Sequence, residues 1–368
     1  MNKIILANPK INIKDVLRIF KSVLNSNFVN ESKKTRQFEK KICKFLNSKY
    51  CVTTTSGTTA LFLALKAVGI KQNDEVIVPN ITFPATANAV KMAGGIPVFV
   101  DVNKSNLLID EKCLLKTITK KTKFLIPVHI SGRGSNIKKL VKICKKNSIK
   151  IIEDAAEAFG SKLGKINLGN FGEAGCFSLA PNKIITTGQG GIVVTKNKNT
   201  YKILKILKDQ GRIKSSNNNE DKYKRLGYNF KFTDLQAALG ISQLKDIRWR
   251  MKKLKKIHKF YLKNIKQNKN FKIIKFDIKK GELPLWTDVW CKDKEKLFNY
   301  LKSKNIFCRY YWQPLSLNPV FLNSKKNLKN SIELQKKMMW LPSSLEMTFN
   351  QQKKVCYFIN LFYSKKFD

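Results

Sequence analysis

Residues 151–195 read IIEDAAEAFGSKLGKINLGNFGEAGCFSLAPNKIITTGQGGIVVT, and this stretch decides how the chain is expected to fold. It begins with an apolar pair, Ile151 and Ile152, and soon reaches Asp154. A buried parallel strand has this pattern when it delivers a polar side chain at its carboxyl end. Open α/β sheets bind their ligands outside the carboxyl ends of the strands. Asp154 is therefore a candidate functional acid.

Lys183 is unusual because no other lysine lies near it in the sequence. The chain has 72 Lys and Arg residues, mostly Lys, so a 25-residue window holds about four lysines on average, yet 171–195 holds one. We expect partial desolvation of this amine, which disfavours its charged form. A neutral amine attacks carbonyl carbons. Taken alone, a solvated lysine on a surface loop is the commoner interpretation.

Strands and helices alternate through the first two thirds of the chain. Expected strands lie at 51–55, 75–79, 96–100, 123–128 and 150–154, with helical patterns between them. Such alternation predicts an α/β fold with a mostly parallel, doubly wound sheet. At 368 residues the chain exceeds one typical domain. We expect a large domain at 1–245, entered through helices, and a smaller C-terminal α+β domain at 246–368.

The formal charge of +47 raises the question of nucleic-acid binding. The excess is Lys rather than Arg and is spread along the whole chain, whereas specific nucleic-acid readers rely on Arg forks and clustered stripes. We therefore expect no nucleic-acid partner. A positive field would instead attract an anionic substrate.

The sequence shows no membrane span, no signal peptide and no metal-binding pattern. No apolar run reaches the roughly 20 residues of a membrane span, and the N-terminus lacks a signal-peptide core. We expect a cytoplasmic protein that does not associate with membranes. The eight cysteines form no CxxC pair and only His129 and His258 are present, so no metal site is expected.

A strand-to-helix turn at Ser56-Gly57-Thr58 predicts a phosphate site. Ser56 is a good N-cap, and the helix that follows ends at Gly69. Free backbone N–H groups and the positive end of the helix dipole favour an anion there. An ordinary capped helix is the alternative, and without further signals it is the more common one.

Six stretches occur in the order typical of one family. They are SGTTALFLALKAVGI at 56–70, DEVIVPNITFPATANAV at 74–90, IPVFVDV at 96–102, IIEDAAEAFGS at 151–161, GCFSLAPNKIITTGQGGIVVT at 175–195 and GYNFKFTDLQAALGISQL at 227–244. In these stretches the chain resembles the DegT/DnrJ/EryC1/StrS family of pyridoxal 5'-phosphate (PLP)-dependent sugar aminotransferases, and most closely the GDP-perosamine synthase branch. The resemblance implies the fold type I architecture of PLP-dependent transferases.

The resemblance also implies roles for individual residues. Lys183 would bond covalently to PLP, and Asp154 would face the pyridine nitrogen, since PLP enzymes use a lysine and an acid in these positions. The other cofactor contacts implied are Gly57, Thr58 and Ser178 at the phosphate, Phe83 stacked on the ring, Ala156 and Glu157 along it, and Asn229 reaching into the partner of a homodimer.

The implied reaction is transfer of an amine from glutamate to a nucleotide-linked keto-deoxysugar, with GDP-4-keto-6-deoxymannose as the best guess. Lys183 would move the proton. The candidate substrate residues are Phe28, Trp286, Arg309, Trp312 and Gln313. Two alternatives stay open, namely a UDP- or dTDP-linked substrate and a non-catalytic or regulatory PLP-binding protein. The second draws on the loop at 27–32, which lacks the family's usual Gly-Pro pair.

Overall fold

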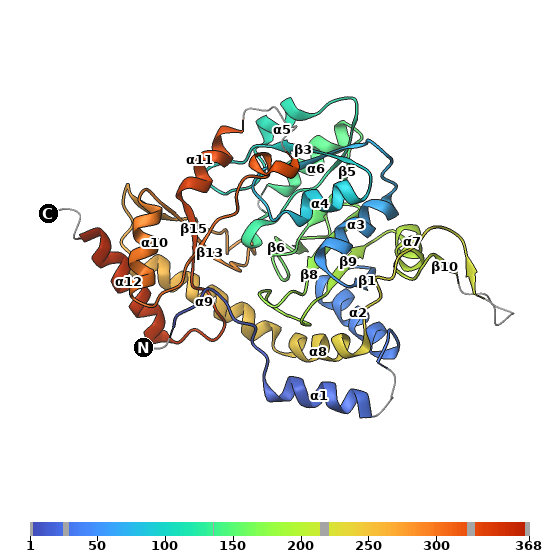
Figure 1. The fold of residues 1–368 in the computed structure, drawn as a ribbon, viewed down its shortest axis with the longest axis horizontal. Coiled ribbons are helices and arrows are strands. Elements are labelled where there is room, and N and C mark those ends of the chain that lie inside the picture. The colour runs from blue at the N-terminus through green and yellow to red at the C-terminus, as the bar shows by residue number, and fades with distance from the viewer. Residues whose placement is uncertain (1–2, 25–28, 135, 214–220, 322–327, 365–368) are drawn as a thin grey trace.

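The computed structural model describes residues 3–24, 29–134, 136–213, 221–321 and 328–364, and it contains a seven-stranded sheet with helices on both faces (Figure 1). The strand order across the sheet is β1-β9-β8-β5-β4-β2-β3. The strands are β1 (Tyr50–Thr54), β2 (Glu75–Pro79), β3 (Ile96–Val100), β4 (Thr122–Leu125), β5 (Lys150–Asp154), β8 (Ala174–Ser178) and β9 (Gly191–Thr195).

The predicted mostly parallel sheet is confirmed. The pairs β2–β3, β2–β4, β4–β5 and β5–β8 are parallel. Strand β9 is the exception, because it runs antiparallel to both β1 and β8. The chain returns from β8 through the loop at 179–190, which contains no crossover helix, and parallel pairing requires such a crossover.

Alternation along the strands creates two hydrophobic layers. Val76 and Ile152 belong to the layer beneath α3 (Gly57–Val68), α4 (Ala85–Met92) and α7 (Lys198–Lys208). Their neighbours Ile77 and Ile151 belong to the opposite layer, beneath α2 (Lys33–Leu46), α5 (Glu111–Thr117) and α6 (Ile137–Lys146). Successive side chains of a strand point to opposite faces, so one central sheet serves both layers.

A second, antiparallel sheet forms in the C-terminal part of the chain. Its order is β12 (Phe271–Ile273), β13 (Thr287–Cys291), β15 (Met338–Leu341) and β14 (Arg309–Tyr310). Residues of α9 (Ile247–Asn264), α10 (Lys294–Ser303) and α12 (Phe349–Ser364) share its hydrophobic core. Ile4 enters the same core and pairs with Ile306, so the N-terminus crosses to this part of the molecule.

The connection between the two parts differs from the single long helix that the sequence suggests. Helix α8 (Asp234–Lys245) ends at Asp246, and α9 begins at the next residue. The division into domains at residue 246 coincides with this break and stays a prediction. Helix α1 (Ile13–Leu24) packs against α8, and α11 (Lys329–Lys337) contacts β13 and β15.

The remaining described elements are short. They are β6 (Lys162–Leu163), β7 (Ile166–Asn167), β10 (Arg212–Ile213) and β11 (Lys222–Tyr223), with the single-turn helices η1 (Ile130–Gly132), η2 (Leu315–Leu317) and η3 (Pro319–Phe321). Figure 1 shows β10 projecting from the body of the molecule.

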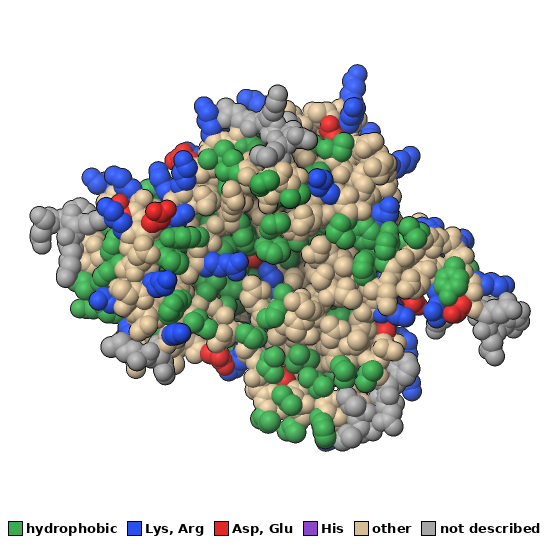
Figure 2. All heavy atoms as spheres, in the orientation of Figure 1, with side chains coloured by type: hydrophobic (Ala, Val, Ile, Leu, Met, Phe, Trp, Pro, Cys, Tyr) green, Lys and Arg blue, Asp and Glu red, His purple; other side chains and the backbone are tan. Residues whose placement is uncertain are grey.

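Basic side chains are dispersed over the face drawn in Figure 2 rather than gathered into a stripe. Among the described residues, no helix combines the length and the apolar character that crossing a bilayer requires.

Candidate active site

Asp154 and Ser178 point to the same side of the sheet because of strand alternation. Asp154 is two residues after Ile152, and Ser178 is two residues after Cys176; both of these apolar residues lie in the layer under α3. Strands β5 and β8 are neighbours, with Asp154 opposite Cys176. The two polar side chains therefore lie at the carboxyl ends of adjacent strands, on the face that α3 covers.

Asp154 is a buried acid with few partners. One carboxylate oxygen accepts a hydrogen bond from Thr86 Oγ1 at 2.7 Å, and the other accepts one from the Ala156 backbone N–H at 3.1 Å. Burial raises the pKa of the Asp154 carboxyl, while these two hydrogen bonds and the charge of Lys183 act in the opposite direction. None of the ion pairs between described residues includes Asp154. A cationic group beside it would stabilise the charged form.

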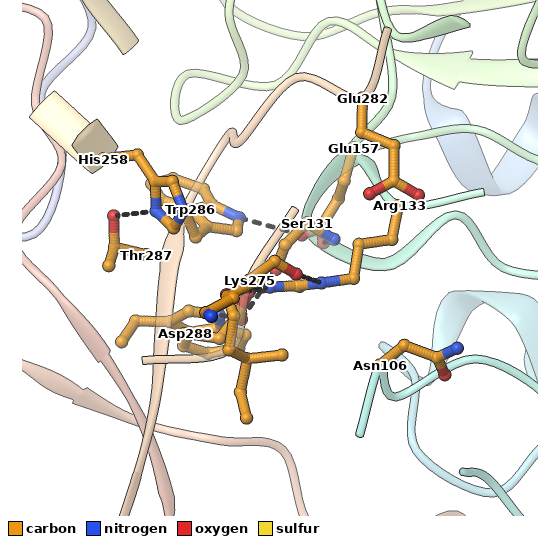
Figure 3. A network of polar contacts seen from close by, with 12 residues as sticks. Asn106, Ser131, Arg133, Glu157, His258, Lys275, Glu282, Trp286, Thr287 and Asp288 are labelled. Carbon is orange, nitrogen blue, oxygen red and sulfur yellow. Dashed lines mark hydrogen bonds and ion pairs between the residues drawn. The ribbon is translucent and has the colours of Figure 1, made fainter. Parts of the chain in front are cut away.

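Lys183 points toward Glu157. Its Nζ lies 3.4 Å from Glu157 Oε1, and both side chains are largely buried. The same Oε1 accepts a hydrogen bond from Trp286 Nε1 at 3.1 Å, and Oε2 accepts one from the Ser131 backbone N–H at 2.8 Å. Figure 3 shows Glu157 between Trp286 and Ser131. The partial desolvation expected of Lys183 is confirmed, since its side chain is 13% exposed.

The turn before α3 forms an anion site beside Ser178. Ser56 caps the helix by accepting from the Thr59 N–H at 3.2 Å, and Thr59 completes a capping box. A Cβ placed on Gly57 would lie 3.0 Å from Ser178 Cβ, so a larger residue would require the helix terminus or β8 to shift by a few tenths of an ångström. Thr58 is half-buried in the first turn. The free N–H groups there and the Ser178 hydroxyl suit a phosphate.

Phe83 is not a core residue. Its side chain is 54% exposed, just after β2 and before α4. Its ring meets Trp312 edge-on, with 6.2 Å between the ring centroids. Trp312 packs edge-on against Trp340 in turn, at 4.8 Å. An exposed ring at the carboxyl edge of the sheet is available to stack on a flat ligand.

The other predicted residues lie in different surroundings. Trp286 is buried with its indole N–H bonded to Glu157, whereas Arg309 and Gln313 are exposed. Arg309 lies over the Trp340 ring at 6.0 Å. Asn229 is exposed and pairs with Asp209 through an isolated bridge. Phe28 falls outside the described residues.

Sequence reasoning did not identify Thr86 or Ser131 as site residues. Thr86 is one turn into α4 from Phe83, and its spacing could have suggested a hydroxyl facing the same site. Ser131 carries no signal, because its role depends on the left-handed backbone that aims its N–H at Glu157.

His129 belongs to the opposite layer rather than to the site. Its Nε2 lies 2.8 Å from Glu153 Oε2, and both side chains are buried. Glu153 also accepts from three backbone N–H groups, those of Gly169, Phe171 and Gly172. From its place after the expected strand at 123–128, His129 could line the cleft or be a structural histidine, and this geometry fits the structural role.

These residues fit PLP on the evidence of the site itself. Asp154, a buried carboxylate without an ion-pair partner among the described residues, suits a protonated ring nitrogen, and the amine of Lys183 lies beside Glu157, near enough for its charge to lower the Asp154 pKa. The glycine turn at α3, with Ser178 behind it, supplies an anion cradle of the kind a cofactor phosphate needs.

Comparison with known proteins gives consistent results. The model of the DegT/DnrJ/EryC1/StrS aminotransferase family matches residues 11–360. The GDP-perosamine synthase of Escherichia coli O157:H7 is 33% identical over 341 residues, covering 90% of each protein. A UDP-4-amino-4,6-dideoxy-N-acetyl-beta-L-altrosamine transaminase of Campylobacter jejuni is 32% identical over 343 residues, again covering 90% of each. The structure of Helicobacter pylori PseC, an aminotransferase involved in the biosynthesis of pseudaminic acid, superposes with a TM-score of 0.93 at 25% identity, over 99% of this chain and 100% of that one.

Proposed function

The chain belongs to the DegT/DnrJ/EryC1/StrS aminotransferase family and is a PLP-dependent sugar aminotransferase, and we propose that it aminates GDP-4-keto-6-deoxymannose to GDP-perosamine with glutamate as the donor. The observation that carries the proposal is the pairing of a buried acid, Asp154, with a buried amine, Lys183, at one carboxyl edge of the sheet.

Each end of the site has its own task. Lys183 would hold the cofactor covalently and move the proton during transfer, and Glu157 Oε1, 3.4 Å away, orients its amine. Asp154, held in place by Thr86 and the Ala156 N–H, would hold the ring nitrogen and keep it protonated. When bound, PLP supplies an electron sink that stabilises negative charge on the carbon next to the amine.

The remaining contacts hold the cofactor in position. Gly57, Thr58 and Ser178 bind its phosphate, and the exposed Phe83 ring covers one face of the pyridine. Ala156 is small enough to leave room for a flat ring along the backbone after β5, where Glu157 also lies.

The sugar nucleotide enters from the side of the smaller sheet. Arg309 and Gln313 are exposed there, and Trp312 contacts Phe83. Arg309 offers a positive charge to a diphosphate. Trp286, whose indole N–H is bonded to Glu157, acts on the cofactor side instead.

The relatives act on sugars linked to different nucleotides. The relative with the GDP-perosamine synthase name is 33% identical and the UDP-sugar transaminase is 32% identical, so identity does not separate them. We favour the GDP-sugar because that name also belongs to a relative in Vibrio cholerae, at 29% identity.

We further propose that two copies of the chain share their active sites. Asn229 is exposed on the segment after β11 and would reach the PLP phosphate of a partner subunit. A two-fold axis would then complete both sites at once.

A substrate panel tests the assignment. The purified protein is incubated with PLP, glutamate and GDP-, UDP- or dTDP-linked 4-keto-6-deoxysugars, and amination is followed by mass spectrometry. We expect the GDP-mannose derivative to give the highest kcat/KM. Amination of a UDP- or dTDP-sugar without amination of the GDP-sugar would contradict the proposed substrate.

A further inference from the structure

A buried carboxylate in the smaller sheet lies at the centre of a polar network next to the site. Asp288, in β13, is completely buried, and its Oδ1 accepts from Ser131 Oγ at 2.8 Å, Tyr311 OH at 3.0 Å and Trp340 Nε1 at 2.7 Å. Its Oδ2 accepts from the Arg133 guanidinium. Figure 3 shows Asp288 together with Ser131 and Arg133. Such a carboxylate has a fixed orientation, because every oxygen is committed.

Arg133 neutralises Asp288 and is equally committed. Its other nitrogens donate to the backbone carbonyls of Lys275 at 3.3 Å and Ile274 at 2.9 Å. Its guanidinium lies over the Phe276 ring, 3.6 Å from the centroid. The pair joins the β4–α6 loop of the large sheet to β13 of the smaller one, so the two sheets are held together at this point.

Ser131 is held in a strained conformation between Asp288 and the site. Its backbone is left-handed, with φ 53° and ψ 12°, which is uncommon for a residue other than glycine. Three contacts hold it there. Its hydroxyl donates to Asp288, its carbonyl accepts from the Leu285 N–H at 2.9 Å, and its own N–H donates to Glu157 Oε2 at 2.8 Å.

Glu157 therefore receives both of its fixed hydrogen bonds from groups that depend on β13. The first comes from Ser131, which Asp288 anchors. The second comes from Trp286, two residues before Asp288 in the chain, at 3.1 Å. The third contact of Glu157 is the amine of Lys183. A shift of Asp288 would therefore move Ser131, and through the Glu157 carboxylate it would change the position of the Lys183 amine.

We propose that Asp288 is a positioning residue for the active site: it holds Ser131 in its left-handed conformation, and Ser131 in turn orients the Glu157 carboxylate toward Lys183. The inference rests on the proposed roles of Lys183 and Glu157 and adds a group from the smaller sheet that touches neither PLP nor substrate. The packing of the two sheets against each other thereby determines the position of the Lys183 amine.

Two substitutions that each remove one hydrogen bond to the same oxygen test the proposal. Ser131→Gly removes the hydroxyl that bonds to Asp288 while leaving φ 53° accessible. The backbone N–H that faces Glu157 is then no longer held in place by Asp288. Tyr311→Phe removes a hydroxyl that donates to the same Asp288 oxygen but makes no hydrogen bond to Glu157 in the part of the chain that the structure describes. Each variant is compared with the wild type in three measurements. PLP is titrated into the apo-protein, and the PLP-loaded enzyme is then used for visible circular dichroism and for kcat and KM.

We expect Ser131→Gly to weaken PLP binding by about tenfold, since a hydrogen bond to a charged group is at stake. It should also reduce the visible circular dichroism and lower kcat with little change in KM. Tyr311→Phe should stay within about twofold of the wild type in all three measurements. Asp288→Asn, if it folds, should behave as Ser131→Gly does, because the amide no longer holds Arg133 as a charged partner.

Equal effects of Ser131→Gly and Tyr311→Phe would overturn the proposal and leave Asp288 a purely structural residue. The variant Lys183→Ala separates this outcome from failure of the proposed site. If borohydride still fixes PLP to Lys183→Ala, the assignment of Lys183 is wrong whatever Ser131 does. If it does not, and the two hydroxyl variants agree, only the positioning role is lost.

Discussion

Glu153 and Asp154, at the end of β5, lie in different surroundings because successive side chains of a strand point to opposite faces. Asp154 faces the layer under α3 and keeps a carboxylate without an ion-pair partner among the described residues. Glu153 faces the other layer, where His129 and three backbone N–H groups satisfy it. A single residue thus separates a carboxylate that is free to act on a ligand from one that holds the core together.

Lys183→Ala should remove the chemistry and keep the fold. We expect kcat to fall by about 10²–10⁴-fold, the usual contribution of a general acid and base, and PLP no longer to be fixed by borohydride. Lys196→Ala is a matched control, because its amine donates to the Asn170 carbonyl at 2.9 Å and lies in the same stretch of sequence. A fully active Lys183→Ala would refute the assignment.

His258 should make the protein acid-sensitive. Burial, reinforced by the charge of Arg133, lowers the pKa of His258 to about 3. The unfolded chain titrates near 6.5, so below that pH the unfolded state binds a proton that the folded state refuses. Stability is therefore complete above about pH 6.5 and is lost as the pH falls toward 3. At pH 5 the loss amounts to about 2 kcal/mol.

His258→Asn tests this contribution. The amide can replace the contact of Nδ1 with Thr287 Oγ1, 3.4 Å away, but does not titrate. Denaturant unfolding at pH 7.5 and pH 5 should show a smaller loss of unfolding free energy for the variant than for the wild type. Carboxylates contribute equally to both proteins, so an identical loss would show that His258 does not resist protonation.

At the scale of elements, the site depends on how closely α3 approaches β8. The capping box at Ser56 and Thr59 fixes where the helix begins, and Gly57 allows its terminus to meet Ser178. The antiparallel β9 contributes to the same crowding, since a Cβ on Gly191 would lie 2.0 Å from the Ser56 carbonyl oxygen. The proposed anion cradle thus depends on the close packing of α3, β8 and β9, with glycines, Gly57 and Gly191, at the contacts.

Gly57→Ala should weaken PLP binding more than it changes stability. Alanine is the better helix former by about 1 kcal/mol, which offsets part of the cost of the contact 3.0 Å from Ser178 Cβ. The helix terminus must then move away from Ser178, and we expect the PLP Kd to rise about tenfold. Absorbance titration of the apo-protein gives the Kd, and thermal melting gives the stability. An unchanged Kd would mean that the phosphate binds elsewhere.

At the scale of the whole molecule, the site is assembled from two sheets. The larger one supplies Asp154, Lys183 and the turn at α3, whereas the smaller one supplies Trp286 and, through Asp288, the anchor of Ser131. The formal charge of +47 has no counterpart in a basic stripe on the face that Figure 2 shows. Its effect is expected at long range, on the approach of an anionic nucleotide.

Shared sites predict complementation between two inactive variants. If Asn229 completes the partner's site, a dimer of one Lys183→Ala chain and one Asn229→Ala chain has one site with both changes and one with neither. An equal mixture, unfolded and refolded together, should recover about a quarter of the wild-type activity, since half of its dimers are mixed. Each variant refolded alone is the control. Recovery of nothing would place Asn229 in the site of its own chain.

The sequence by itself determined the mostly parallel sheet, because a strand-helix alternation needs only local periodicity and turn residues to be legible. It also indicated Asp154 and Gly57, which stand at the end of a strand and the start of a helix, and Lys183, which has no other lysine near it in the sequence. Ser178 was indicated only by the family resemblance. The antiparallel direction of β9 and the helix break at Asp246 were not predicted, because both depend on the path that the chain takes through the tertiary structure.

Only the tertiary structure decided which groups surround Lys183. Glu157, Ser131 and Trp286 meet beside it from segments far apart in the chain, and no local pattern records that meeting. The same holds for Asp288, which reads as an ordinary acid in a strand until packing buries it among Arg133 and three other donors. Long-range contacts form when two sheets close on each other, and sequence periodicity carries no information about that closure.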